Sequence, residues 1–317
     1  PRVLTLVRAF PNDLALDLGF AGYGALAPRI QANGYDPMAP ISVRRAVGEM
    51  GARGFLTERS LTPPIALLRL WAIDAVQVQT SDLLRAPTDE GFEVTIEPGT
   101  RRAFAIPFLR IKALSLSLGA TPRAPLALFV RVNGNREVPL GAVSDARGTV
   151  LSPSYRVDAV ILEAPREGTA VRVTGLALET QEGGIAQVSR LSAYLSQDAF
   201  HEIASTPQIR VFRVLGAEAL VRGAAPVDLE QGPRPGGRLV FRSEASQPVE
   251  IALPYLNGWS GRATEHFGRT RLEAKAGVST TLRYTPPLFY PGLAIGGLGL
   301  LAAMWLLLKP ANVAALL

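Results

Sequence analysis

The sequence lacks cysteine altogether and contains only two histidines, His201 and His266. Without a thiol the chain cannot carry out thiol catalysis, and two histidines are too few for most zinc sites. Lysine is also scarce, because the 33 basic residues include only Lys112, Lys275 and Lys309. Arginine therefore supplies almost all of the formal net charge of +6, and it occurs as single residues in strand-like segments, as on a solvated surface. We expect no nucleic-acid partner.

The motifs that resemble active sites are all incomplete. Each histidine stands beside a carboxylate, in Phe200-His201-Glu202 and in Glu265-His266-Phe267, but neighbouring side chains on a strand point apart. We interpret both as surface histidines. Gly258-Trp259-Ser260-Gly261 lacks one spacer residue of a nucleophile elbow. Asp89, Glu90 and Glu93 lack the alternating spacing of a calcium loop. The sequence thus predicts no catalytic residue, no metal, no cofactor and no enzyme, and a hydrolytic function is disfavoured.

Charge is also missing from a long hydrophobic run, Leu288 to Leu308, which ends at Lys309. A helix of this length spans roughly 31 Å at about 1.5 Å per residue, close to the hydrocarbon thickness of a bilayer. We predict a single transmembrane helix over residues 288–308. Amphipathic rings and a cation near its two ends fit the membrane interface, namely Phe289, Tyr290, Trp305 and Lys309.

Small residues recur along this predicted helix. Gly292, Gly296, Gly299 and Ala303 stand at offsets of four, seven and eleven, which places them on one face. Such a face lets a second helix approach closely, and Gly292 with Gly296 also forms a GxxxG pair. The alternative is that glycine is simply common in membrane helices. We expect membrane lipids and other integral membrane subunits as partners.

The flanking charges orient the predicted anchor. The tail after it, residues 309–317, has Lys309 as its sole charged side chain, which favours a cytoplasmic C-terminus. Residues 1–287 then lie in the periplasm or outside the cell. Basic residues shortly before the span weaken this inference, namely Arg269, Arg271, Lys275 and Arg283.

The remaining chain has 25 prolines and 30 glycines, which are typical of many turns and short strands. A mixed α/β domain is predicted from residues 1–84 plus 187–230, with a helix at Ile65 to Trp71 and a strand at Ala75 to Gln79. Its second part has a strand-like segment at Ser189 to Gln197 and a helical turn at Asp198 to Ile203.

Residues 85–186 are predicted to form an inserted β-sandwich of the jelly-roll-like kind, because short strands follow one another without a strong helix. Its strongest turn signal is Asn133-Gly134. The segment Gln231 to Gly237 has the composition of a linker, and residues 231–287 form a membrane-proximal antiparallel β module. The expected fold class is mainly β with a small α/β part and one C-terminal transmembrane helix.

Several short motifs resemble the extracytoplasmic part and last span of the YfhO-like bacterial membrane proteins. In the first part these are Arg2-Val3-Leu4, Asn12, Gly34-Tyr35-Asp36-Pro37 and Leu67-Leu68-Arg69-Leu70-Trp71-Ala72-Ile73. Near the end they are Pro254-Tyr255-Leu256-Asn257-Gly258-Trp259, Ala276-Gly277-Val278 and Leu282-Arg283-Tyr284-Thr285-Pro286.

That family resembles multi-span, lipid-sugar-dependent glycosyltransferases whose acidic catalytic residues lie between early membrane helices. Those helices are not in this sequence, so the resemblance transfers no catalytic residue. It implies an ectodomain on one anchor in a bacterial inner membrane.

Two functional hypotheses follow. The first is a non-catalytic, membrane-anchored periplasmic subunit of a larger complex, such as an energy-transducing respiratory or photosynthetic assembly. The alternative is a glycan or lipid-sugar binding ectodomain of a YfhO-like glycosyltransferase system, in which aromatic rings stack on the sugar. The candidate rings are Trp259, Tyr255, Tyr155 and Phe129.

Overall fold

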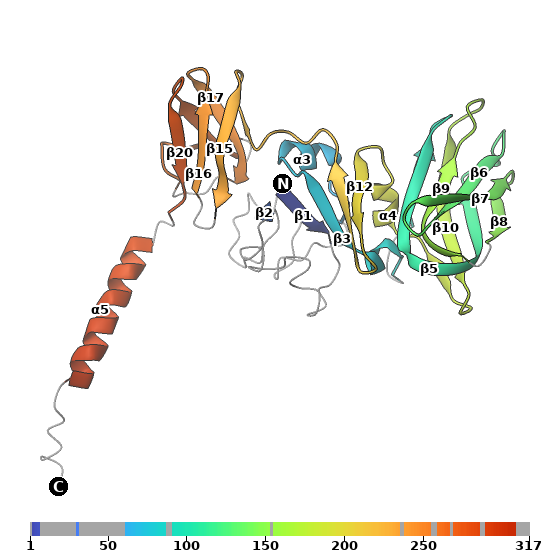
Figure 1. Cartoon of the computed structure of the whole chain (residues 1–317), viewed down its shortest axis with the longest axis horizontal. Helices are drawn as coiled ribbons and strands as arrows, with labels where there is room; N and C mark the ends of the chain where they lie inside the picture. The colour runs from blue at the N-terminus through green and yellow to red at the C-terminus, as the bar shows by residue number, and fades with distance from the viewer. Residues whose placement is uncertain are drawn as a thin grey trace, which may run out of the picture. The chain divides into compact units, whose positions relative to one another are not determined.

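Most of the chain is described by the structure, a computed structural model shown in Figure 1. The described residues are 2–6, 30–31, 61–86, 91–152, 155–234, 238–254, 259–266, 269–285 and 289–308. They divide into two compact units, Pro1–Ala219 and Leu220–Leu317, which we call unit 1 and unit 2. The fold is mainly β with several antiparallel sheets, which confirms the coarse fold class predicted from the sequence.

Unit 1 contains a five-stranded sheet. Its strands, in spatial order, are β12 (Phe200–Ser205), β13 (Ile209–Val214), β3 (Ala75–Gln79), β1 (Arg2–Leu6) and β2 (Ile30–Gln31). The pairs of β1 with β2 and β3 are parallel, and the other two pairs are antiparallel. Every residue from Val3 to Leu6 is buried, as expected for a strand covered on both faces. Helix α3 (Ile65–Leu70) contributes Leu68 to the same apolar cluster.

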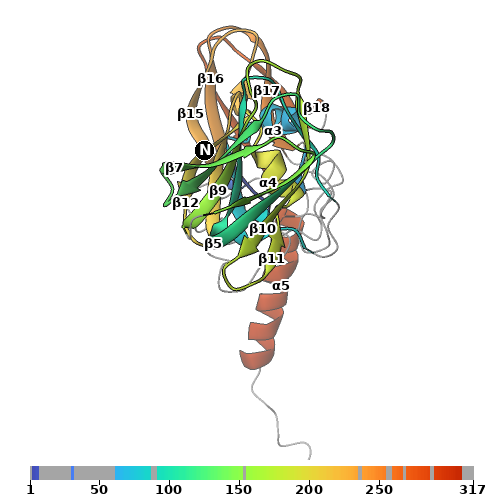
Figure 2. The same cartoon turned by 90° about the vertical axis from the view of Figure 1, so that its right-hand side faces the viewer.

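The residues between β3 and β12 form an eight-stranded sheet, which we call the inserted sheet. Its main path runs through β11 (Ile185–Gln187), β10 (Val171–Thr180), β5 (Arg101–Leu118), β9 (Arg156–Glu163), β6 (Leu126–Val132) and β7 (Arg136–Val143). Two further strands lie off this path: β4 (Val94–Ile96) pairs with β10, and β8 (Arg147–Leu151) pairs with β5. Figure 2 shows these strands from a second side.

The long strand β5 belongs to both halves of the inserted sheet. Its first half pairs with β9, and its second half pairs with β10 and β8. The register shifts between Ala105 and Leu109, around Pro107, whose missing N–H suits a bulge. The structure assigns these residues to one strand, which the register shift divides. Side chains from both halves, such as Phe104 and Leu116, join one buried apolar cluster.

The turn between β6 and β7 lies where the sequence predicts it. Asn133 and Gly134 have positive φ angles of 53° and 79°, a conformation that asparagine and glycine tolerate best.

Helix and strand are exchanged in one part of unit 1. The segment Ser189 to Gln197, predicted to be strand-like, contains helix α4 (Arg190–Leu195), and the predicted helical turn at Asp198 to Ile203 overlaps β12. The side chain of Ser189 accepts a hydrogen bond from the N–H of Ser192 at 3.2 Å. This N-cap begins the helix, and the sequence prediction missed it.

A fully buried arginine connects the inserted sheet to the five-stranded sheet. Arg210 of β13 donates from Nη2 to the carbonyl oxygens of Ile106 on β5, at 2.5 Å, and Asp158 on β9, at 2.7 Å. Its Nη1 donates to Oε1 of Glu202 at 2.8 Å. Burial lowers the pKa of the Arg210 guanidinium, and the nearby carboxylates oppose that effect. Arginine nevertheless stays protonated, so the site holds a permanent buried cation.

Arg131 of β6 completes this network. Its Nε donates to Oδ1 of Asp158 at 3.0 Å, and its Nη2 donates to Oε2 of Glu202 at 2.5 Å. The other oxygen of Asp158, Oδ2, is buried and has no hydrogen bond with a described residue. The four charged side chains thus fix how β5, β6 and β9 lie against β12 and β13, at a considerable cost in desolvation.

Replacing Arg210 with methionine should lower the free energy of unfolding by about 3–5 kcal/mol, because Glu202 and two carbonyl groups lose a buried donor. The matched control is Arg213→Met, since Arg213 is an exposed residue of the same strand. Urea denaturation of both variants measures the difference. Equal midpoints for the two variants would show that the buried network contributes nothing to stability.

Unit 2 contains two antiparallel sheets around one apolar cluster. The four-stranded sheet runs β14 (Val221–Arg222), β17 (Gln247–Pro254), β19 (Arg269–Ala274) and β18 (Thr264–His266). The three-stranded sheet runs β15 (Val227–Arg234), β16 (Arg238–Ser243) and β20 (Ser279–Arg283). Residues 231–234 continue β15, so the linker predicted there is wrong for these positions.

Helix α5 (Phe289–Leu308) ends the described chain and has 20 residues. Ala294 to Leu301, together with Ala303 and Met304, are exposed. Within the part of the chain that the structure describes, no helix is long and apolar enough to cross a membrane. The transmembrane span over residues 288–308 stays a prediction.

Residues 7–29 and 32–60 of the predicted mixed α/β domain lie outside the described residues. The same holds for the tail, residues 309–317.

Candidate functional site

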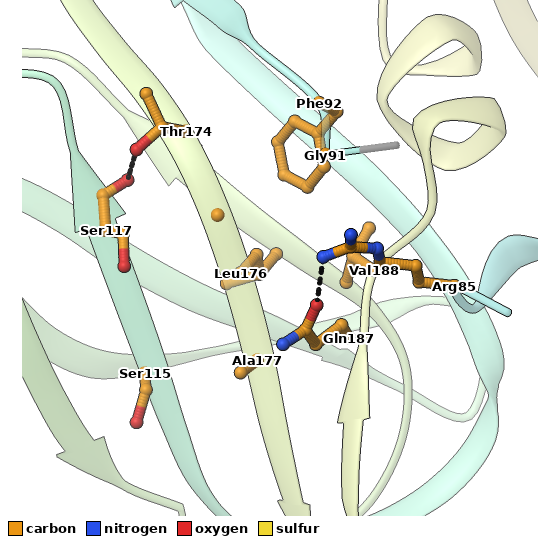
Figure 3. Close-up of a pocket in the computed structure, with 11 residues that line it drawn as sticks. Arg85, Gly91, Phe92, Ser115, Ser117, Thr174, Leu176, Ala177, Gln187 and Val188 are labelled. Carbon is orange, nitrogen blue, oxygen red and sulfur yellow. Dashed lines mark hydrogen bonds between the residues drawn. The ribbon is translucent and has the colours of Figure 1, made fainter. Parts of the chain in front are cut away.

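A cavity of 230 Å³ lies over β5, β10 and β11 in unit 1, and we call it the hydroxyl cavity (Figure 3). Its floor consists of small side chains on neighbouring strands, because Ser117 pairs with Gly175 and Ser115 pairs with Ala177. A Cβ atom on Gly175 would lie 3.5 Å from the Cβ of Ser117. These short side chains leave the room that larger ones would fill.

Arg85 and Gln187 form one wall of the hydroxyl cavity. Nη1 of Arg85 donates to Oε1 of Gln187 at 2.7 Å, as Figure 3 shows, and the backbone N–H of Arg85 donates to the carbonyl oxygen of Gln187 at 2.7 Å. On another side, the hydroxyl of Thr174 donates to the carbonyl oxygen of Ser117 at 3.2 Å. Phe92, drawn with its ring in Figure 3, also lines the cavity and is 7 % exposed.

These groups can bind a polar ligand. Three hydroxyls, one amide and one guanidinium can exchange hydrogen bonds with a polar ligand, and a ring offers an apolar edge. Among the described residues that line the cavity there is no histidine or carboxylate to activate a serine. In the same described part of the chain, no three histidine or acidic side chains gather as a metal site.

A second cluster surrounds Glu250 in unit 2. Its Oε2 accepts from Nη2 of Arg222 at 2.7 Å and lies 2.9 Å from Nη2 of Arg269. Its Oε1 lies 2.6 Å from Nδ1 of His266. Partial burial raises the pKa of the Glu250 carboxyl, but the cations of Arg222 and Arg269 outweigh that effect and leave the pKa below its ordinary value. Glu250 is therefore ionised at neutral pH.

This cluster should make stability depend on acid pH. Because the folded-state pKa of Glu250 lies below the ordinary 4.5, its contribution is complete above that pH and is lost as the pH falls through the lowered value. Glu250→Gln should therefore destabilise the protein by about 2 kcal/mol at pH 7, with the difference from the unmodified chain shrinking in stronger acid. Urea unfolding at a series of pH values measures this. A difference that stays constant into strong acid would contradict the assignment.

The aromatic candidates from the sequence do not meet in one place. Trp259 packs against the apolar cluster of unit 2, with its ring centroid 5.1 Å from that of Tyr284. Phe129 has the guanidinium of Arg101 5.1 Å from its ring centroid. Tyr155 is 38 % exposed, and Tyr255 lies outside the described residues. The structure brings none of the three described rings to the hydroxyl cavity, whose aromatic side chain is Phe92.

The predicted helix face lies on α5. Gly296, Gly299 and Ala303 are exposed, and added Cβ atoms on Gly296 and Gly299 would meet nothing within 4 Å. Gly292 lies in the first turns of the same helix. The predicted interface residues Phe289, Tyr290 and Trp305 also belong to α5, whereas Lys309 lies outside the described residues.

The two histidines differ in their surroundings. His201 is exposed, as predicted, whereas His266 is 32 % exposed in its side chain and takes part in the Glu250 cluster. Of the acidic residues near position 90, Glu93 forms an ion pair with Arg172. Asp89 and Glu90 lie outside the described residues.

Sequence reasoning missed both polar sites. The hydroxyl cavity depends on β5 lying beside β10, more than fifty residues further along the chain, and no local motif marks it. The Glu250 cluster has one weak signal in the sequence: Arg269 and Arg271 stand two positions apart, which on a strand places both on one face.

No protein-family model matches the chain, and no curated protein matches it by sequence. Three solved structures share local similarity. An α-L-fucosidase structure from Bacteroides ovatus has 9 % identity and a TM-score of 0.25, over 75 % of this chain and 39 % of that one. The arabinofuranosyltransferase AftD from Mycobacteria has 13 % identity and a TM-score of 0.19, over 75 % and 24 %.

The third structure is a GH2 β-galacturonidase from Eisenbergiella tayi, with 12 % identity and a TM-score of 0.11, over 62 % of this chain and 29 % of that one. This chain spans well under half the length of all three proteins. Scores this low carry no argument about fold or function.

Proposed function

We propose that this protein is a non-catalytic subunit of a larger membrane complex, anchored by α5 with units 1 and 2 in the bacterial periplasm. The observation that carries the proposal is the exposed apolar surface of α5. Its large side chains Ile295, Leu298, Leu300, Leu301 and Met304 are between 50 % and 71 % exposed. Soluble proteins seldom leave so many neighbouring apolar side chains in water, so lipid or another protein covers them.

The composition of α5 favours lipid as the main cover. Its 20 residues include no charged side chain. A helix that docks on a soluble partner normally keeps one polar face, and α5 has none. The exposed small residues Gly296, Gly299 and Ala303 provide the face on which a neighbouring membrane helix packs.

Membrane anchoring is tested by fractionation of cells that express the full chain. The protein should remain in the membrane pellet after alkaline carbonate washing, and a variant with Leu298→Arg and Leu301→Arg should lose this retention, because each charge costs about 3 kcal/mol at the centre of a bilayer. The matched control is Leu298→Ile with Leu301→Ile. Full extraction of the unmodified chain by carbonate would reject the anchor.

Helix packing is tested separately in mild detergent. Gly296→Leu with Gly299→Leu should reduce the size of the complex in size-exclusion chromatography, because leucine side chains prevent close approach. Gly297→Leu is the matched control, since Gly297 stands off the predicted face of the same helix. Complexes of equal size in both variants would show that the small-residue face makes no contact with another helix.

The hydroxyl cavity favours a second candidate, a glycan or lipid-sugar binding ectodomain of a YfhO-like system. Sugars present many hydroxyls, which match those of Ser115, Ser117 and Thr174.

Ser117→Ala with Thr174→Val should abolish binding on a glycan array, and Thr95→Val, an exposed change on β4 outside the cavity, should not. An array with no bound glycan would remove this candidate. The jelly-roll-like β-sandwich predicted for residues 85–186 is part of this second proposal.

A further inference from the structure

A cavity of 320 Å³ lies on the four-stranded sheet of unit 2, beside the Glu250 cluster. It is lined by Arg222, Gly223, Ala224, Pro248, Glu250 and Arg271. We propose that this cavity, which we call the arginine cavity, binds the phosphate group of a small phosphorylated molecule or of a lipid head group between Arg222 and Arg271. The proposal does not depend on α5 or on the membrane anchor.

The strand register creates the site. Arg222 on β14 pairs with Glu250 on β17, and Glu250 pairs with Arg271 on β19. Paired residues on neighbouring strands point to the same face, so the two guanidinium groups flank one carboxylate. The alternate residues Val249, Ile251 and Leu272 face the apolar cluster on the opposite side. The charged row therefore occupies the outer face.

Several arginines lie close together beside the arginine cavity. Glu250 is shared by Arg222 and Arg269, of which Arg269 is 4 % exposed in its side chain. Burial and the charge of Arg222 lower the pKa of Arg269, in line with crowded cations. Arg271 adds a further guanidinium that lines the cavity. A phosphate monoester, which carries about −1.5 to −2 at pH 7, is the kind of anion that a guanidinium binds.

Arg271 is the group best placed to bind the ligand. Its guanidinium forms no hydrogen bond or ion pair with any described residue, although it lines the cavity. Glu273 stands two residues further along the same face of β19 and forms no ion pair with Arg271 among the described residues. The planar guanidinium of Arg271 can donate two parallel hydrogen bonds to phosphate oxygens. Arg222, whose Nε and Nη2 donate to Glu250, adds its positive charge on the other side of the cavity.

The wall opposite β19 is held in place before any ligand arrives. Gln247 accepts from the N–H of Ala225 at 2.7 Å through Oε1 and donates to the carbonyl oxygen of Ala225 at 3.0 Å through Nε2. A Cβ atom on Gly223 would lie 2.5 Å from Nε2 of Gln247, so the absence of a side chain at Gly223 permits this clamp. A cavity of this size and rigidity admits a phosphate with a small organic group.

The test uses the full chain in non-ionic detergent and isothermal titration calorimetry with glycerol 3-phosphate, with glycerol as the uncharged comparison. Wild type should bind glycerol 3-phosphate and not glycerol. Arg271→Gln should weaken binding about tenfold or more, because one charge-assisted contact is lost. Arg238→Gln is the matched control, since Arg238 is an exposed arginine of unit 2 on the other sheet. It should bind as wild type does.

A second arm identifies the source of the phosphate. Binding to liposomes is compared with and without phosphatidic acid, for wild type and for Arg271→Gln. A loss confined to phosphatidic acid liposomes assigns a lipid head group, whereas a loss seen only with glycerol 3-phosphate assigns a soluble ligand. The proposal is overturned if wild type binds neither ligand, or if Arg271→Gln and Arg238→Gln behave alike in both arms while their thermal unfolding is unchanged.

Discussion

The buried guanidinium of Arg210 is the constraint on which unit 1 depends. It lies where strands from two sheets meet, and it donates to the carbonyl oxygens of Ile106 and Asp158, which lie at register shifts of their own ladders. An arginine in this position is costly to desolvate, and the negative charges of Glu202, its ion-pair partner, and of Asp158 only partly compensate for that cost. The planar guanidinium and its three acceptors fix the position of β13 relative to β5 and β9. An apolar contact has no such directional requirement.

The arginines of the two units differ in their partners. In unit 1 Arg210 and Arg131 both form ion pairs with carboxylates of the fold itself. In unit 2 Arg222 and Arg269 share Glu250, and Arg271 forms no ion pair with any described residue. Arginines paired within the fold stabilise structure, whereas a guanidinium such as that of Arg271 can bind an anion. The composition, in which almost every basic residue is arginine, does not distinguish a structural arginine from one that can bind a ligand.

Much of the β structure follows from local sequence, because alternation over Ala75 to Gln79 and the turn at Asn133-Gly134 are short-range signals. The exchange of helix and strand after Ser189 shows where prediction from local sequence fails. A six-residue helix has too few turns for its period to emerge, and its N-cap bond to Ser192 was the only local cue. Neither cavity could be predicted, since Ser117 with Gly175 and Arg222 with Arg271 come together only through pairing of distant strands.

The two ends of the inserted sheet meet. Leu84 forms a bridge with Val188, and the N–H of Ser189 donates to the carbonyl oxygen of Leu83 at 2.9 Å. The chain thus leaves the five-stranded sheet and returns to it at nearly one point. The entropy of closing such a loop rises only slowly with its length, so the host sheet tolerates a hundred-residue excursion almost as readily as a short one. The inserted sheet can accordingly change in sequence or size over evolution without altering the topology of its host.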